Sequence, residues 1–416
     1  MSKTFFLLII LVALKSILWV KTVPVFQTPD EQAHFTQLSY IAENKTINIA
    51  WDKNLSEEIA TVEEILGTRR DPQGNNKYTY HPEYKNRSVI PDLPTESRTN
   101  YVDRESAGYP PLYYLLDLPF YYVSYQGNVG DRVMASRALS VICNLLLVIT
   151  AYFIGKIIWE DKLKSLVLAV MVGFQPMVSF VSAGIHPDNL LNLIYSAGIL
   201  VCLLILKKGV SLSRLCLLVV LIFLGLQTKQ LMFLFFPVAA AAVLNNYAIL
   251  LLPILAFIFR WPVPYMPIDE NYPLALSEYL RFRVPKLAFE MWPWFWGVFK
   301  WLGVTLHPLI MKVITRVAVI SGIGIFIKLR KNSFERKAMI FFLFSIVSYT
   351  VYLFLWDWRL MQAIGYSQGL QGRYLFPNIV PIMALFVIAF GRFSPLLAVG
   401  MVFLNGYALW LINNLY

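Results

Sequence analysis

Long apolar runs separated by short polar connectors dominate this sequence. Such runs lie near residues 5–25, 134–158, 165–185, 189–206, 212–228, 308–327, 337–356, 374–390 and 394–413. About 20 apolar residues are needed for a helix to cross the hydrocarbon core of a bilayer. The stretch 231–260 is expected to hold two shorter spans divided at Asn245-Asn246. The pattern predicts an all-α polytopic membrane protein with about eleven transmembrane helices.

Basic residues are concentrated in alternate connectors. Connectors 156–164, 207–214 and 328–337 are basic, and Arg392 lies in another. Lys and Arg near helix ends mark the cytoplasmic side, so the N-terminus and these connectors are predicted to be cytoplasmic. Segments 26–108 and 261–307 are then extracytoplasmic loops. This count requires that 109–125, rich in aromatic residues, is an interfacial helix of the outer side and not a span.

Composition excludes other classes of protein. Of the 416 residues 57% are hydrophobic and 15% are charged, whereas soluble domains carry about 25% charged residues. Cys143, Cys202 and Cys216 all lie inside apolar runs, so no disulfide framework is indicated. The net charge of +11 is more typical of cytoplasmic connectors that meet lipid phosphates than of a nucleic-acid partner. We expect a single integral membrane domain over residues 1–416.

Two adjacent carboxylates follow the first predicted helix on its outer side. Asp30 and Glu31 come directly after Pro29, and His34 follows one helical turn later. These side chains are suited to a general base, to a divalent metal site (Mg²⁺ or Mn²⁺ held by Asp30 and Glu31), or to both. Helix capping explains the same residues without any chemistry, since Thr28 or Asp30 starts a helix after the proline.

Cations occur at predicted outer helix ends, where the orientation of the protein does not require them. Arg132 and Arg137 open one span, Arg373 follows Gly372 at another, and Lys229 lies in an outward turn. A guanidinium there is a candidate ligand for phosphate or carboxylate. The structural alternative is snorkelling to the interface.

Several further polar or aromatic residues are predicted at the same outer surface. Asp188 is suited to capping a helix, and Pro110-Pro111 are suited to starting an interfacial one. The candidate substrate-pocket residues are His34, Tyr109, His186, Asp188, Gln371 and Tyr374.

The predicted topology brings all these motifs to one side of the membrane. Carboxylates beside several cations at an outer surface are typical of an enzyme that holds a lipid-linked phosphate and activates an acceptor hydroxyl. No glycine-rich phosphate loop and no zinc spacing is present in the sequence.

Six short motifs in order also resemble a known family. They are Pro29-Asp30-Glu31 with His34, Tyr109 to Tyr114, Arg137 to Ser140, His186 to Asn189, Phe295 to Trp301, and Gln371 to Tyr374. The chain resembles, from Phe5 to about Ile412, predicted multi-pass membrane proteins grouped under a domain of unknown function within the GT-C glycosyltransferase superfamily, which includes protein mannosyltransferases and aminoarabinose transferases. Lys300 stands where relatives often have glycine.

The resemblance implies a GT-C-like fold and a transferase that uses polyprenyl-phosphate sugars. Asp30 or Glu31 would take the acid-motif role, and Arg137 would lie near the donor phosphate. Arg373 is inferred from the residues as a second phosphate contact, with Lys229 as an additional cation. A metal is not required, because arginines can replace it.

The resulting hypothesis is an integral glycosyltransferase of the cytoplasmic membrane, with its active site on the extracytoplasmic face and a role in cell-envelope glycan or glycoconjugate synthesis. It would move a sugar from a polyprenyl-phosphate donor to a glycan, lipid or protein acceptor. A transporter of lipid-linked saccharides and a non-catalytic scaffold are the alternatives. A transporter needs polar groups at mid-span, and Lys15 is the main such residue.

Overall fold

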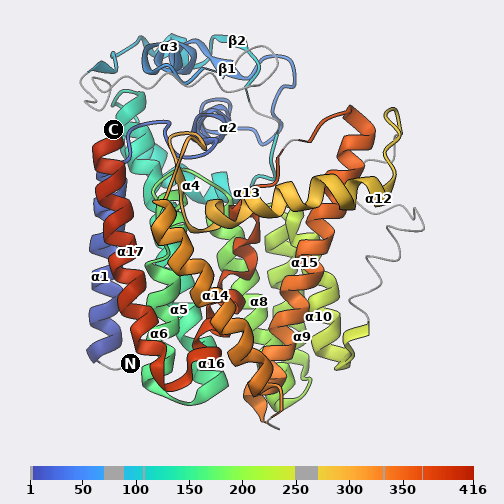
Figure 1. Ribbon diagram of the computed structural model, residues 1–416. Coiled ribbons are helices and arrows are strands. Elements are labelled where there is room, and N and C mark those ends of the chain that lie inside the picture. The colour runs from blue at the N-terminus through green and yellow to red at the C-terminus, as the bar shows by residue number, and fades with distance from the viewer. Residues whose placement is uncertain (1–2, 70–88, 106–107, 249–269, 331–332, 368) are drawn as a thin grey trace.

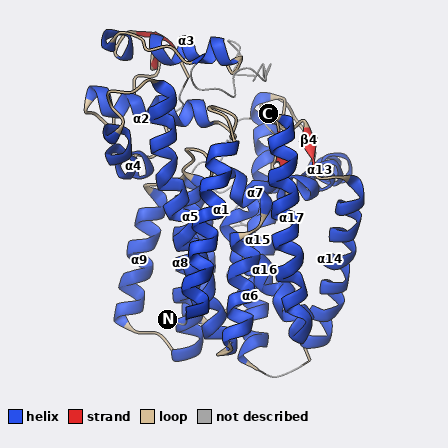
Figure 2. Ribbon diagram, turned by 90° about the vertical axis from the view of Figure 1, so that its left-hand side faces the viewer, coloured by secondary structure: helices blue, strands red, loops and turns tan. Residues whose placement is uncertain are grey.

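The computed structural model describes residues 3–69, 89–105, 108–248, 270–330, 333–367 and 369–416. Nearly all of its regular structure is helical, and the short strands lie in the outer loops (Figure 2). The first half contains α1 (Lys3–Thr22), α2 (Glu31–Asn44), β1 (Leu55–Ser56), α3 (Glu57–Leu66), η3 (Thr95–Arg98), β2 (Tyr101–Asp103), α4 (Leu112–Val123), α5 (Val129–Trp159), α6 (Lys162–Gly173), α7 (Pro176–Val181) and α8 (Asp188–Lys208).

The second half also combines long helices with shorter elements, and several of the short elements lie between α10 and α14. It contains α9 (Leu212–Leu226), η4 (Gln230–Leu234), α10 (Phe235–Leu244), α12 (Leu276–Glu278), η6 (Tyr279–Arg283), α13 (Val284–Trp296), β3 (Val298–Phe299), β4 (Val304–Thr305), α14 (Pro308–Lys328), α15 (Phe334–Ile364), η7 (Gly372–Asn378), α16 (Ile379–Phe390), η8 (Gly391–Phe393) and α17 (Ser394–Leu415).

The long helices form a bundle, and helices α2 and α3 lie across one end of it (Figure 1). Helix α13 also runs across this end, so both predicted outer loops lie at the same end of the bundle. Helix α1 begins at the opposite end, and α17 finishes at the end that carries α2 and α3. We call the end that carries α2 and α3 the loop end.

Six segments of the described residues are long and apolar enough to cross a membrane: Lys3–Thr22, Val129–Trp159, Asp188–Lys208, Pro308–Lys328, Phe334–Ile364 and Gly372–Leu415. The last contains both α16 and α17, and α9 and the η4–α10 segment are shorter apolar helices. The eleven spans expected from the sequence are therefore not confirmed. Part of the predicted pair at 231–260 lies outside the described residues.

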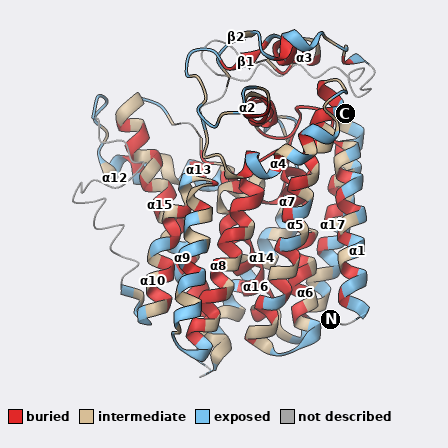
Figure 3. Ribbon diagram, turned by 180° about the vertical axis from the view of Figure 1, so that it is seen from behind, coloured by how far each residue is buried: buried red, intermediate tan, exposed pale blue. Residues whose placement is uncertain are grey.

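Exposed residues occur along the helices of the bundle (Figure 3), and many of them are large and apolar. On α14 only Ser321 is buried, and Phe326 on the same helix is 65% exposed. A helix with an apolar exposed surface is suited to a lipid solvent and not to water. This distribution supports the membrane class that the apolar runs predicted.

The segment 165–185, predicted as one span, is instead broken into α6 and α7. Gln175 caps α7 with its side chain, and Pro176 follows at the first helical position, where its missing N–H leaves no unsatisfied bond. Lys15 of α1 compensates for the break, because its Nζ donates to the carbonyl of Gly173 at 2.8 Å and to Ser179 at 2.9 Å. Lys15, in the middle of α1, thus satisfies polar groups at the break between α6 and α7.

Candidate functional site

The turn between α1 and α2 places two carboxylates in different directions. Asp30 has φ of 57°, in the left-handed region, and makes no side-chain cap bond to α2. This conformation is unfavourable for most residues, and asparagine and aspartate tolerate it best. Asp30 thus occupies the N-cap position of α2, as the capping alternative expected, but its side chain does not make the capping bond. Glu31 is in the first turn of that helix.

Glu31 pairs with Arg137 inside the protein. Arg137 Nε and Nη2 each donate to one oxygen of Glu31 at 2.7 Å, and both side chains are 0% exposed. The other guanidinium hydrogens reach the carbonyls of Val20, Val23 and Pro24. The five donors of an arginine are thereby all engaged. This placement leaves no donor of Arg137 for a phosphate and does not direct Glu31 toward a substrate.

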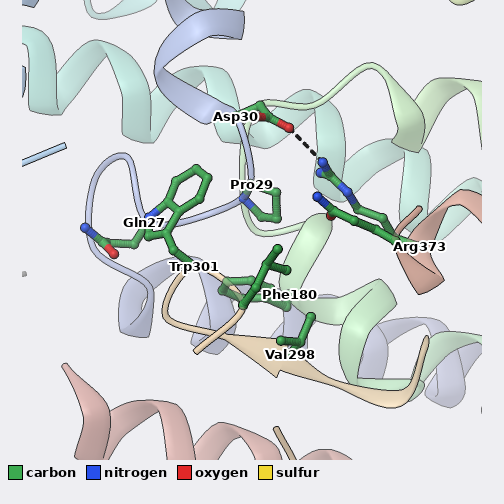
Figure 4. A pocket seen from close by; sticks show the side chains of 9 residues that line it. Gln27, Pro29, Asp30, Phe180, Val298, Trp301 and Arg373 are labelled. Carbon is green, nitrogen blue, oxygen red and sulfur yellow. Dashed lines mark hydrogen bonds and ion pairs between the residues drawn. The ribbon is translucent and has the colours of Figure 1, made fainter. Parts of the chain in front are cut away.

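Asp30 instead meets Arg373, from the far end of the chain. Arg373 Nη2 donates to Asp30 Oδ2 at 2.7 Å (Figure 4). Arg373 Nη1 lies 2.9 Å from Nε2 of His186. Arginine only donates, so Nε2 of His186 accepts this bond. The Nε of Arg373 is buried with no hydrogen-bond partner among the described residues. Unlike Arg137, this guanidinium keeps an unused donor.

A second ion pair continues the cluster beyond His186. Asp188 Oδ2 lies 3.5 Å from His186 Nδ1, and Asp188 Oδ1 accepts from Nζ of Lys229. Burial favours the neutral amine, but the adjacent Asp188 carboxylate outweighs it and raises the pKa of Lys229. Asp188 was considered as an N-cap, yet Pro187 occupies the cap position. Its carboxylate binds Lys229 instead.

The histidines of this cluster are neutral. Burial lowers the pKa of His34 to about 3, and burial followed by the charge of its neighbours places the pKa of His186 well below its usual range. The two rings lie 4.5 Å apart, and His34 Nδ1 is 2.8 Å from the hydroxyl of Tyr114. Burial also raises the pKa of Tyr114. These groups are oriented hydrogen-bond partners and not charge carriers at neutral pH.

A cavity of about 130 Å³ opens on one side of the Asp30–Arg373 pair (Figure 4). We call it the acid-side cavity. Its lining residues are Gln27, Pro29, Asp30, Phe180, Val298, Trp301, Leu302, Gln371 and Arg373. The cavity combines one carboxylate, one guanidinium, two amides and aromatic walls. Such a mixture is suited to a small polar ligand that also presents an apolar face.

The β3–β4 hairpin supplies one wall of the acid-side cavity through an unusual turn. Lys300, Trp301 and Leu302 have φ values of 47°, 51° and 66°, all in the left-handed region. Each such residue costs roughly 1–2 kcal/mol when it is not glycine. Strained backbone is found preferentially at functional sites, and here it carries Trp301 and Leu302 into the cavity wall.

A second cavity of about 360 Å³ lies beside Lys229. We call it the lysine-side cavity. Its lining residues are Gly108, Tyr109, Pro110, Lys229, Gln230, Leu231, Phe233, Leu234, Tyr352, Leu353, Trp356 and Tyr374. Most of these side chains are apolar or aromatic. The chain Asp30–Arg373–His186–Asp188–Lys229 thus joins a small polar cavity to a larger apolar one.

Most of the predicted site residues meet in this region. The ring of His34 lies 5.0 Å from that of Tyr109 in a tilted arrangement, and Arg373 lies over the ring of Tyr374. Asp30 and Gln371 line the acid-side cavity. Glu31 and Arg137 instead form a buried ion pair with each other. The predicted roles of the individual residues stay predictions.

Some residues of the site gave no usable signal in the sequence. Gln27 and Phe180 line the acid-side cavity, but each is a single unremarkable residue in its segment. Trp301 occurs in one of the quoted motifs, although nothing in its spacing indicated a left-handed turn. Arg132, which was considered as an anion ligand, is 0% exposed and pairs with Glu58.

The carboxylates do not fit the metal site considered from the sequence. Asp30 and Glu31 bind different arginines and do not share a coordination point. Within the described ranges there is no group of three His, Cys, Asp or Glu side chains placed to hold an ion. The metal stays an untested prediction.

Comparison with solved structures identifies the class of fold. The chain is similar to the oligosaccharyltransferase of Archaeoglobus fulgidus bearing a tethered acceptor peptide, with a TM-score of 0.50 and 11% identity over 99% of this chain and 55% of that one. The apo form of the same protein gives a TM-score of 0.47 at 11% identity, covering 98% and 55%. This chain therefore spans about half the length of that enzyme. The fold is GT-C-like, and the likeness extends to the fold alone.

The family is defined by sequence. Residues 13–383 match the family described as "Predicted membrane protein (DUF2142)", and the chain belongs to this family. A comparison with curated proteins finds no match. The family match agrees with the class of membrane protein expected from the residues.

Proposed function

We propose that this protein is a membrane glycosyltransferase that moves a sugar from a polyprenyl-phosphate donor to an acceptor hydroxyl at the loop end, which we take as extracytoplasmic. One observation carries the proposal. A carboxylate and two cations, Asp30, Arg373 and Lys229, lie in one connected chain between a polar and an apolar cavity. Such a chain is suited to holding a lipid phosphate on one side and an acceptor on the other.

In the proposed reaction Asp30 takes the proton of the acceptor hydroxyl. The acceptor oxygen then attacks the anomeric carbon of the donor sugar, and the bond from that carbon to the phosphate oxygen breaks. Its electron pair leaves on the polyprenyl phosphate, so a single displacement inverts the sugar carbon. Arg373 and Lys229 stabilise the negative charge that develops on this leaving group, and such stabilisation is usually the largest catalytic contribution.

The proposal assigns the donor phosphate to Arg373 and Lys229, without Arg137. Arg137 was the first candidate from the sequence, but all its donors already bind protein acceptors. Arg373 has a buried Nε with no partner in the described part of the chain. A polyprenyl chain attached to the phosphate would extend along the apolar lysine-side cavity.

The transporter alternative loses its main support from sequence. Lys15 was the mid-span polar residue expected of a transport path, and it bonds the broken end of α6 and Ser179. The scaffold alternative predicts that Asp30 tolerates substitution without loss of any activity.

The experiment incubates the purified protein with radiolabelled polyprenyl-phosphate sugars and measures the transfer of the sugar. The release of polyprenyl phosphate is measured in parallel. We expect Asp30→Asn to reduce turnover by roughly 10²–10⁴-fold, the range for loss of a general base. Asp103→Asn is a matched control, because it removes the same charge from an exposed Asp–Arg pair at a distance from the cavities. Near-full turnover of Asp30→Asn would contradict the assignment. Absence of both transfer and donor hydrolysis with every sugar donor would contradict the function.

A further inference from the structure

The proposed base and the proposed phosphate ligand bind each other in this structure. Arg373 Nη2 donates to Asp30 Oδ2 at 2.7 Å. The side chain of Arg373 is 3% exposed and that of Asp30 is 30% exposed. A carboxylate that is paired with a guanidinium is a weakened base, because the positive charge stabilises its ionised form. The unliganded pair is therefore not arranged for catalysis.

The charges of the cluster cancel without a substrate. Two cations, Arg373 and Lys229, face two carboxylates, Asp30 and Asp188. His186, between the pairs, is neutral because burial and the nearby charges lower its pKa. An incoming phosphate adds negative charge to a buried neutral site. Burial of an uncompensated charge is unfavourable, so one cation must give up its carboxylate.

Asp30 is the carboxylate that is placed to leave. Asp188 is 8% exposed, follows Pro187 at the start of α8, and contacts Lys229 and His186. Asp30 is more exposed, lines the acid-side cavity and lies at a left-handed position where it makes no cap bond to its own helix. Rotation of its side chain toward the cavity requires no movement of a span.

We propose that the donor phosphate displaces Asp30 from Arg373 and thereby releases the base for the acceptor. The inference rests on the proposed function. Binding is then ordered, with the phosphate first and the acceptor second. The exchange replaces one ion pair of Arg373 by another and moves no proton.

The test is a double-mutant cycle in the binding of farnesyl phosphate, with inorganic phosphate as a second probe. The variants are Asp30→Asn, Arg373→Gln and the double variant, with Asp103→Asn as the control. If Asp30 occupies Arg373 for about nine-tenths of the time, its removal should tighten binding roughly tenfold, because affinity scales with the fraction of competent protein. Arg373→Gln should weaken binding.

The cycle separates competition for Arg373 from simple repulsion between Asp30 and the phosphate. With competition, Asp30→Asn gives no gain once Arg373 is glutamine. With repulsion, the gain persists in that background. Tighter binding by Asp30→Asn that depends on Arg373, and unchanged binding by Asp103→Asn, supports the proposal. Weaker or unchanged binding by both Asp30→Asn and Asp30→Ala, or a gain that persists without Arg373, overturns it.

Asp30→Ala is the second variant, because it removes the carboxylate without introducing an amide, and it should also tighten binding. A gain with farnesyl phosphate but not with inorganic phosphate indicates that the prenyl chain is needed to seat the phosphate, and still supports displacement. Failure of the wild type to bind either probe overturns this inference together with the phosphate site of the proposed function. Normal binding by the wild type without a gain in either Asp30 variant overturns the displacement alone.

Discussion

Replacement of Arg137 by lysine distinguishes a structural arginine from a substrate ligand. Arg137 makes two bonds of 2.7 Å to Glu31, and three to the carbonyls of Val20, Val23 and Pro24. Lysine has three donors in place of five and lacks the planar fork. At least two acceptors then lose their partners, in a region where both charged side chains are 0% exposed.

The magnitude follows from those lost bonds. A hydrogen bond to a charged group contributes about 1.5–3 kcal/mol, and one to a neutral carbonyl about 1 kcal/mol. Arg137→Lys should therefore lower the free energy of unfolding by roughly 2–4 kcal/mol. Arg137→Gln also removes the charge and leaves Glu31 unpaired, which should cost about 3–5 kcal/mol.

The assay is thermal unfolding of the purified protein in detergent, followed by binding of farnesyl phosphate at a temperature where each variant is folded. Arg104→Lys is the control, because Arg104 is exposed and lies over the ring of Trp51. We expect lower stability and unchanged affinity for Arg137→Lys. Wild-type stability with lost affinity would refute this reasoning and would return Arg137 to the donor site.

Three further outcomes are expected. Gly372→Ala should lower both the stability of the protein and its turnover, because the Cβ of the alanine would lie 2.1 Å from the backbone nitrogen of Phe295. A normal unfolding temperature of this variant would contradict the prediction. Lys15→Met should lower the free energy of unfolding by about 2 kcal/mol, since the carbonyl of Gly173 loses its hydrogen-bond donor. An unfolding temperature equal to that of the wild type would contradict this prediction. Folded His34 has a pKa of about 3 against 6.5 unfolded, so the unfolded state binds the proton first and stability should fall as pH drops from 6.5 toward 3. Unfolding temperatures measured across this range should decline in the wild type and decline less in His34→Gln.

The sequence determined the class of protein and the general location of its chemistry. Apolar runs of membrane length predict helices wherever the solvent is lipid, because only helices and closed barrels satisfy the backbone there. The helices α1, α5, α8, α14, α15 and α17 follow these runs. The short motifs identified Asp30, His186 and Arg373 as candidates, since charged and titratable residues near apolar helix ends need a reason to be there.

The tertiary structure decided how those residues are paired. From sequence, Asp30 and Glu31 were both candidates for the acid-motif role, and Arg137 and Arg373 were both candidates for the donor phosphate. In the structure Glu31 and Arg137 form an ion pair in which both side chains are 0% exposed. Asp30 and Arg373 form another ion pair, which lines a cavity. Partners separated by 106 and 343 positions are chosen by how helices pack. No local pattern encodes that choice, because the energy of an ion pair depends on burial and geometry that exist only once the distant segments have met.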